Sequence, residues 1–281
     1  MATKFKLITD SSSDIPAELV GRYDITIVPN VVNIGNKSYL DDGKEITRED
    51  FYEQMPAMSE LPKTAACPLG LTRELVAAKA AEADHLILVA VSPKLSSIYN
   101  NFRLAAEEFS PGRYTLIDSG QTTMGEGFQV IQAAEMAEEG ASLDAIVAAL
   151  DSLRKRTQIF AVLNTLENLR KSGRVGWATA TAGRLLQLKP MIELSQGDVS
   201  SIGNIRTFKR AAAKLLETGL SYGPLDRLAV MHTNNPEAAE KLRQGLASVY
   251  PLDKIPMMNV NPGLGVHVGA QALGIALTTK E

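Results

Sequence analysis

The chain has 281 residues, of which 45% are hydrophobic, 22% charged and 5% aromatic. This balance is typical of a folded globular protein and excludes an intrinsically disordered chain. The 29 basic and 32 acidic residues nearly cancel, which argues against a protein held on nucleic acid or on a membrane by bulk charge. The single cysteine, Cys67, excludes an internal disulfide, and neither it nor the three histidines indicate a metal site.

The beginning of the sequence lacks the apolar stretch and cleavage site of a signal peptide, which predicts a cytoplasmic protein. Residues 255–279 contain no Lys, Arg, Asp or Glu and are long enough to cross a bilayer. Prolines and glycines within them would break a membrane helix and leave backbone groups unpaired in lipid. We therefore expect a buried strand, a loop and a second buried element there, and no membrane span.

The first half of the sequence alternates strand and helix patterns. Strands are expected over 4–9, 25–33, 85–91 and 114–117. Helices are expected over 16–20 with Ser13 or Asp14 as cap, from the capping box at Thr47 to 55, and over 72–83, 97–109 and 128–139. Because 85–91 is apolar on both faces, it is predicted to be a central parallel strand. The alternation implies a parallel α/β sheet.

The second half is richer in strands. We expect a strand over 159–163 and an antiparallel hairpin of 191–194 and 199–202 around the turn at 196–198. Further strands are expected over 228–231, 257–260 and 273–277, with helices over 208–216, ending at Gly219, and from Asn235 to 246. At roughly 150 residues per domain, the change of pattern predicts two domains, 1–157 and 158–281, the second with a mixed sheet.

Several common catalytic and nucleotide-binding motifs are absent from the sequence. There is no P-loop, no dinucleotide-binding glycine fingerprint, no G-x-S-x-G elbow and no H-E-x-x-H zinc motif. The paired acids Asp41 and Asp42 precede Gly43 and are interpreted as part of a solvated turn. No nucleotide cofactor is therefore expected.

Small hydroxyl residues follow several predicted strands where helices begin. They lie in 10–13 with Ser11 and Ser12, in 64–68 with Thr64, in 92–97 with Ser96 and Ser97, and in 118–119 with Ser119. In an open parallel sheet such junctions line the ligand crevice, where helix N-termini favour an anion. Hydroxyls add donors without adding charge. The pattern favours a small acid or carboxylate as ligand; ordinary caps and turns are the alternative.

His267 lies in the glycine-rich, uncharged stretch 261–269, where Gly265 and its neighbours allow a backbone to approach a ligand closely. A buried histidine with satisfied hydrogen bonds is the alternative. Cys67 is interpreted as a buried, inert thiol rather than a nucleophile. The basic groups at 154–156, 170–174 and 206–210 are either solvated helix faces or surfaces that steer an acidic partner.

Six segments in chain order resemble motifs of one known family. They are LITDSSSDIP at 7–16, Thr64 with Pro68, LSSIY at 95–99, LENLRKSGRV at 166–175, LKPMI at 188–192 and VHVG at 266–269. Together they cover nearly the whole chain and resemble the DegV family. The chain departs from the family pattern at Ala65-Ala66-Cys67, at Ser172 and at Gly269-Ala270-Gln271. These departures bear on the shape of the pocket and on partner recognition.

The resemblance implies an N-terminal Rossmann-like domain and a C-terminal domain built on a six-stranded, mainly antiparallel or mixed sheet. It implies a carrier that buries a long-chain fatty acid and presents the carboxylate to a separate fatty-acid kinase, without a catalytic residue of its own. Thr64, Ser96 and His267 would hold the carboxylate, and Arg174 and Arg206 would contact the kinase. No cofactor is implied beyond the fatty acid, and transient contact with a membrane surface would serve lipid exchange.

Two other functions compete with the carrier. One is a small hydrolase or transferase acting on acyl esters through Ser96 or Ser11 with His267, because serine–histidine pairs occur without an elbow motif. The other is a sensor of short carboxylic acids. Turnover of esters would support the first, and competition by acetate would support the second.

Overall fold

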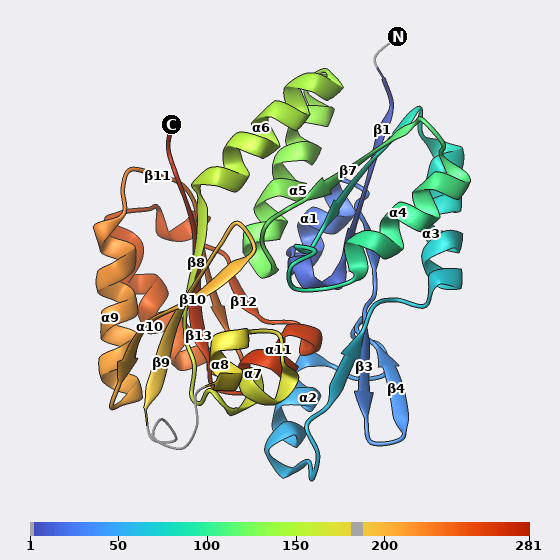
Figure 1. Ribbon diagram of the computed structural model, residues 1–281. Coiled ribbons are helices and arrows are strands. Elements are labelled where there is room, and N and C mark those ends of the chain that lie inside the picture. The colour runs from blue at the N-terminus through green and yellow to red at the C-terminus, as the bar shows by residue number, and fades with distance from the viewer. Residues whose placement is uncertain (1–2, 181–187) are drawn as a thin grey trace.

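The computed structural model describes residues 3–180 and 188–281 and contains three sheets (Figure 1). The first has the order β2-β1-β6-β7, all parallel, and is formed by β1 (Phe5–Asp10), β2 (Thr26–Val28), β6 (His85–Ala90) and β7 (Tyr114–Asp118). β6 lies between β1 and β7, as predicted for a central strand, and both of its faces are covered. Successive residues of a strand point to opposite faces of the sheet, and each face of β6 packs against helices. Leu86 and Leu88 contact α3 (Leu69–Glu82) and α4 (Ile98–Phe109), whereas Ile87 and Val89 face α5 (Thr123–Glu138).

The second sheet has the order β10-β9-β8-β13-β11-β12 and is antiparallel except for the β11–β12 pair. Its strands are β8 (Thr157–Val162), β9 (Lys189–Ser195), β10 (Asp198–Ile205), β11 (Leu225–His232), β12 (Met257–Asn259) and β13 (Leu273–Thr279). One face packs on α9 (Phe208–Ser221) and α10 (Pro236–Gly245) through a cluster that includes Phe160, Val230 and Leu215. The predicted fold class, a parallel α/β sheet plus a six-stranded mixed sheet, is confirmed.

The two large sheets share one hydrophobic core. α5 lies between them, and its buried residues Met124, Phe128 and Val130 belong to a cluster with Ile87 of the first sheet and Ala276 of the second. α6 (Leu143–Arg156) packs beside α5 and leads directly into β8 (Figure 1). The division into domains at 157/158 stays a prediction; the structure adds that β8 begins at Thr157 and that the core is continuous across this point.

A third, three-stranded sheet has the order β4-β3-β5, from β3 (Val31–Ile34), β4 (Lys37–Leu40) and β5 (Lys63–Ala65). It packs with α2 (Arg48–Gln54) and with α11 (Pro262–Val268), a helix close to the end of the chain. Val32, Phe51, Tyr52 and Val266 form the core of this contact. Segments about 200 residues apart in the sequence therefore meet at one end of the first sheet. The remaining α-helices of the described residues are short: α1 (Ala17–Arg22), α7 (Glu167–Ser172) and α8 (Gly176–Ala180).

The structure corrects several predicted elements. The expected strand 25–33 is two strands in two different sheets, because Pro29 and Asn30 interrupt it and the chain crosses over. α9 continues past Gly219 to Ser221, and the glycine packs closely against a neighbouring side chain, because a Cβ there would lie 2.6 Å from Leu246 Cδ2. α6, capped by Ser142, was not predicted. Neither Ser13 nor Asp14 caps α1, which starts after Pro16 without a side-chain cap.

The uncharged stretch 255–279 contains β12, α11 and β13, so a helix stands where a loop was expected between two buried strands. Asn261 caps α11 by accepting a hydrogen bond from the Leu264 N–H at 2.8 Å. Within residues 3–180 and 188–281, no helix has the length and apolar character needed to cross a membrane.

Candidate functional site

A cavity of about 520 Å³ lies between the first sheet, the face of the second sheet that α9 does not cover, and α11. Its volume is within the range of about 300–1,000 Å³ that is usual for small-molecule sites. Alternation along β8 places Ile159 and Ala161 on the cavity side, and Phe160 and Val162 on the α9 side. The apolar lining also contains Leu163, Val175, Ile192, Leu194, Val199, Met231, Val260, Leu264 and Leu273.

Small residues in the second sheet leave room above it. Gly274 of β13 stands opposite Ala161 of β8, and Ala161 stands opposite Ile192 of β9. A Cβ on Gly274 would lie 3.3 Å from Met231 Cε and 3.5 Å from Ala161 Cβ. Larger side chains in this row would occupy the cavity, so its depth depends on these two small residues.

The polar end of the cavity is built by β5, α11 and the N-terminal end of α4. Thr64 Oγ1 and His267 Nε2 are 3.2 Å apart, which joins two residues of the predicted site across 203 positions. Burial, together with the positive charge of Arg174, lowers the pKa of His267 to about 4, so the imidazole is neutral at pH 7. Its Nδ1 has no hydrogen-bond partner among the described residues. A neutral imidazole can donate from one nitrogen and accept at the other.

Ser96 and Ser97 line the same cavity just before α4. Ser97 occupies the N-cap position but makes no side-chain cap hydrogen bond. Ser96 Oγ accepts from the Ile98 N–H at 3.4 Å, and its O–H stays available to donate. Hydroxyl donors and the first turn of a 12-residue helix therefore face one end of a mainly apolar cavity.

The remaining predicted site residues lie in different places. Ser12 lines the cavity, whereas Ser11 on the same turn does not and donates instead to Asp41 Oδ2 at 3.0 Å. Ser119 is fully buried outside the cavity lining and bonds to the backbone of Gln121. Arg174 is exposed at the edge of the cavity. Arg206 is exposed between β10 and α9, outside the lining.

Gly265 packs against an aromatic ring rather than lining the cavity. A Cβ at this position would lie 2.3 Å from Tyr52 Oη and 2.7 Å from Tyr52 Cζ. Tyr52 is held in place because its hydroxyl donates to the Val260 carbonyl at 3.0 Å. We expect Gly265→Ala to lower the free energy of unfolding by about 1–3 kcal/mol through overpacking, as measured by urea denaturation. Gly263→Ala, where the nearest contact is a side-chain oxygen at 3.1 Å, is the milder comparison, and equal losses would contradict this role.

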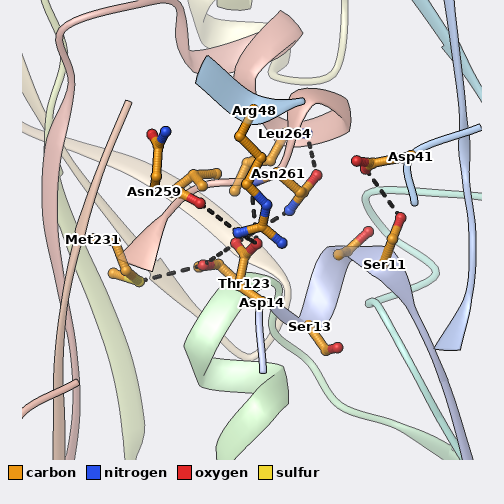
Figure 2. Close-up of polar contacts among 12 residues, drawn as sticks. Ser11, Ser13, Asp14, Asp41, Arg48, Thr123, Met231, Asn259, Asn261 and Leu264 are labelled. Atoms are coloured by element: carbon orange, nitrogen blue, oxygen red, sulfur yellow. Dashed lines mark hydrogen bonds and ion pairs between the residues drawn. The ribbon is translucent and has the colours of Figure 1, made fainter. Parts of the chain in front are cut away.

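A buried polar network lies behind the Ser11–Ser13 turn (Figure 2). Asp14, whose side chain is fully buried, accepts from Thr123 Oγ1 at 2.7 Å and from the Asn261 N–H at 3.0 Å, and it forms an ion pair of 2.9 Å with Arg48. Arg48 also donates to the Asn259 carbonyl. The network joins the turn, the start of α5, α2 and the segment that leads into α11 and His267.

The interpretation of Asp41 as part of a solvated turn is wrong. Asp41 is 8% exposed and accepts hydrogen bonds from Ser11 Oγ and, at 3.4 Å, from the Gly263 N–H (Figure 2). Burial raises its pKa to about 7, against the opposing effect of Arg48. The sequence showed only two acids before a glycine, a pattern that turns share; the burial comes from α11, which packs on this loop from the other end of the chain.

Two further buried acids lie under the same turn. Asp10 is fully buried and accepts from the Ser12 N–H, from Asn30 Nδ2 and from the Val91 N–H. Glu126 of α5 accepts from Thr9 Oγ1 at 3.0 Å, and burial together with the neighbouring Asp10 raises its pKa well above the usual range. Burial beside a second acid therefore favours the neutral form of the Glu126 carboxyl.

Sequence reasoning did not select Asn30 or Thr123, although both line the cavity. Thr123 has φ = 44°, which a β-branched residue rarely adopts, and its bond to Asp14 holds it there. Asn30 follows Pro29 inside the expected strand 25–33, and this proline is the sequence signal of a break. In the described residues, no group of three or more His, Cys, Asp or Glu side chains could hold a metal ion.

Comparison with known proteins gives consistent matches along the chain. A DegV domain-containing protein of Streptococcus pyogenes serotype M6 is 33% identical over 277 residues, which cover 96% of this chain and 97% of the relative. A solved structure described as "Fatty Acid Binding of a DegV family Protein from Thermus thermophilus" has a TM-score of 0.90 and 32% identity, covering 99% of this chain and 100% of that chain. A fatty acid binding DegV family protein from Streptococcus agalactiae has a TM-score of 0.87 and 27% identity, covering 100% of both chains. A family model described as "Uncharacterised protein, DegV family" matches residues 4–280, and the chain therefore belongs to the DegV family.

Proposed function

We propose that this protein binds one long-chain fatty acid, with the acyl tail along the apolar walls of the cavity and the head group at Thr64, Ser96 and His267. The observation that carries the proposal is the chemistry of the cavity, which is apolar along the second sheet and has neutral donors at one end. Ser12 and Ser97 line the same cavity and are proposed as secondary contacts. Two relatives of this fold, at 32% and 27% identity, are described as fatty acid binding.

The tail and the head group would contribute unequally. Burying an alkyl chain yields about 0.8 kcal/mol per CH₂, so a chain of around fifteen carbons supplies on the order of 12 kcal/mol before ordering costs. Each hydrogen bond to the head group adds about 1 kcal/mol net. The apolar wall would therefore set the affinity, and the hydroxyls would set the orientation and the preference for an acid.

We further propose that the protein is a carrier that presents the head group to a partner fatty-acid kinase, which supplies the chemistry. Arg174 at the edge of the cavity and the exposed Arg206 are the proposed contacts with this kinase. Cys67 does not supply a nucleophile in this proposal, because it is buried and burial raises the pKa of its thiol. A cytoplasmic location and brief contact with a membrane surface for lipid exchange complete the proposal.

The ester-hydrolase alternative requires a histidine that activates a serine. His267 Nε2 lies instead beside Thr64 Oγ1, and Ser11 faces Asp41 on the other side of its turn. These contacts favour binding over hydrolysis. Ester turnover that disappears in His267→Ala would reverse this preference.

Mass spectrometry of the freshly purified protein tests the proposal directly. Native spectra should carry a mass excess that is lost on denaturation and that extracts as a free fatty acid of defined length. A protein that is empty as purified and takes up nothing from a panel of C12–C20 acids would refute the proposal. Competition by acetate at concentrations near that of the fatty acid would favour the short-acid sensor.

We expect Ser96→Ala to weaken fatty-acid binding about five- to tenfold, because one hydrogen bond to the head group is lost while the tail contacts persist. Displacement of a fluorescent fatty acid measures this change. Ser248→Ala, an exposed serine remote from the cavity lining, is the matched control. Unchanged affinity in Ser96→Ala, with the fold intact by circular dichroism, would place the head group elsewhere.

A further inference from the structure

Thr122 places a hydroxyl without a hydrogen-bond partner in the lining of the cavity. It is the N-cap residue of α5, is 7% exposed and lines the cavity. An N-cap threonine usually accepts from one of the first helical N–H groups, but Thr122 makes no such bond and no other among the described residues. Its oxygen is not one of the fully enclosed polar atoms that lack a partner, so it keeps accessible surface. A molecule in the cavity can therefore reach this hydroxyl.

The other threonines of the described lining are already engaged with the protein. Their partners are Asp14 Oδ2 for Thr123 at 2.7 Å, the Gly269 carbonyl for Thr233 at 2.7 Å and His267 Nε2 for Thr64 at 3.2 Å. Each of these hydroxyls holds elements of the fold together. Thr122 differs from them because its hydrogen-bonding capacity is left to whatever occupies the cavity.

The first turn of α5 adds backbone donors beside this hydroxyl. α5 has 16 residues, and the first N–H groups of a helix have no acceptor within the helix. The Glu126 N–H donates to the Thr122 carbonyl at 3.3 Å, and the N–H groups of Thr123 and Met124 precede it on the same turn. The positive end of the helix dipole lies at the same place. A hydroxyl and a helix start together favour an oxygen atom as their partner.

This polar position lies on the wall that the proposed function assigns to the acyl tail. Thr123 Oγ1 is 3.4 Å from Met231 Sδ of β11 (Figure 2), and a Cβ on Gly125 would lie 2.9 Å from Ile159 Cδ1 of β8. Both strands belong to the second sheet. The head-group residues Thr64 and His267 lie instead on β5 and α11, at the third sheet. A tail that extends from them along the second sheet passes the start of α5.

An unsubstituted alkyl chain is a poor neighbour for this position. It would remove water from the hydroxyl of Thr122 and offer no hydrogen bond in return, which is unfavourable for a buried polar group. A hydroxyl or oxo oxygen on the chain would accept from Thr122 or from the first N–H groups of α5. A chain hydroxyl could in addition donate to Thr122 Oγ1.

We propose that the cavity binds a long-chain fatty acid that carries a hydroxyl or oxo group partway along its chain, with this oxygen held by Thr122 and the first turn of α5. The inference rests on the proposed function and specifies the substrate class. The contacts of the head group stay those of Thr64, Ser96 and His267. Thr122 is then the residue that distinguishes an oxygenated chain from a plain one.

Competitive binding to the delipidated protein tests this proposal. Octadecanoic acid and its monohydroxy derivatives, with the hydroxyl on each even-numbered carbon from 6 to 14, displace a fluorescent fatty acid below their aggregation concentrations. We expect at least one derivative to bind about five- to tenfold more tightly than octadecanoic acid, because it makes one hydrogen bond that the plain chain lacks. If no derivative binds more tightly than octadecanoic acid, this inference is overturned alone. If none of the acids binds, the proposed function fails.

Variants of Thr122 show whether this residue carries the preference. Thr122→Val keeps the shape of the side chain, and the extended backbone at φ = −148° accommodates valine. We expect it to bind the favoured derivative about five- to tenfold more weakly than the parent protein does and octadecanoic acid at least as tightly. Thr122→Ser retains the hydroxyl and should retain the preference, and Thr122→Ala repeats the loss if the valine variant does not fold.

Two results with Thr122→Val would contradict the assignment. Equal weakening of both acids would place the head group, rather than a chain oxygen, at the start of α5. An unchanged preference would assign the chain oxygen to another residue. Either result, obtained with a fold that is intact by circular dichroism, would overturn the proposal.

Discussion

Replacing Asp14 with alanine is expected to lower the free energy of unfolding by about 3–5 kcal/mol, the usual cost of removing one partner of a buried ion pair. Asp14 is fully buried and holds Arg48, Thr123 and Asn261 together (Figure 2). Without it the guanidinium of Arg48, which is 31% exposed, loses its nearest counter-charge, and the Asn261 N–H loses its acceptor. A loss of this size is a large fraction of the stability of a typical protein, which is roughly 5–15 kcal/mol.

Chemical denaturation of three variants separates the causes of this loss. Asp14→Asn keeps the shape and tolerates the positive φ of 50° at this position, so it should lose less than Asp14→Ala. Glu107→Ala removes an acid from the exposed i,i+4 pair with Arg103 and should cost no more than about 0.5 kcal/mol. If Asp14→Ala lost as little as Glu107→Ala, the network would not stabilise the fold.

The same substitution should also weaken fatty-acid binding. Asn261 caps α11, and α11 places His267 beside Thr64. Because Asp14 fixes Asn261 through two hydrogen bonds, its loss loosens the polar end of the cavity without touching the ligand. We expect a lower affinity for all acyl lengths alike, since the apolar walls are formed mainly by the second sheet.

Sequence patterns of a few residues correctly predicted several helices and strands. The capping box at Thr47 places the start of α2, where the hydroxyl accepts from the Asp50 N–H at 3.0 Å. The turn at 196–198 predicted the β9–β10 hairpin, and the apolar run at 85–91 predicted the central strand β6. In each case the signal lies within a few neighbouring residues, so no distant contact is needed to interpret it.

Elements that depend on distant contacts were not predictable in this way. Gly219 resembles a helix end, yet α9 continues because the missing side chain makes room for Leu246. The sequence 262–268 resembles a glycine-rich loop, yet it becomes α11 when Asn261 caps it and the third sheet covers it. Both outcomes are set by packing across the fold, which overrides local propensity.

The same distinction between local signals and distant contacts applies to the candidate site. The hydroxyls at 64 and 96 and the imidazole at 267 were selected because they lie at strand ends and in a glycine-rich segment, and all three line one cavity. Ser11 and Ser12 are adjacent in sequence, but the turn directs one to Asp41 and the other to the cavity. Asn30 could not be assigned from sequence, because the Asp10 side chain that accepts from its amide belongs to β1, twenty residues away.

Replacing Asp41 with asparagine is expected to stabilise the protein at high pH and to change it little at low pH. The pKa of Asp41 is about 7 in the folded protein, whereas an unfolded aspartate has a pKa of about 3.9. Between these values the folded state binds the proton that the unfolded state has released. The contribution of Asp41 to stability is therefore greatest below pH 4, falls as the pH rises to 7 and is constant above it.

The size of this effect follows from the difference between the two pKa values, which corresponds to an upper limit of about 4 kcal/mol. Asparagine keeps an oxygen that can accept from Ser11 Oγ and from the Gly263 N–H, and it carries no charge to bury. We expect Asp41→Asn to exceed the stability of the parent protein by no more than about 1 kcal/mol at pH 5 and by about 1–3 kcal/mol at pH 8.

Urea denaturation at several pH values between 5 and 8.5 measures this difference. Other buried groups, such as Glu126 and His267, also make stability depend on pH, but they are common to both proteins and cancel when the variant is compared with its parent. Asp42→Asn makes the same charge change one residue away without removing the contacts to Ser11 and Gly263. A constant difference between Asp41→Asn and the parent across this range would show that Asp41 does not bind the proton. A difference that grows with pH would identify the buried carboxyl behind the turn as a group that weakens the fold at neutral pH while it links the Ser11 turn to α11.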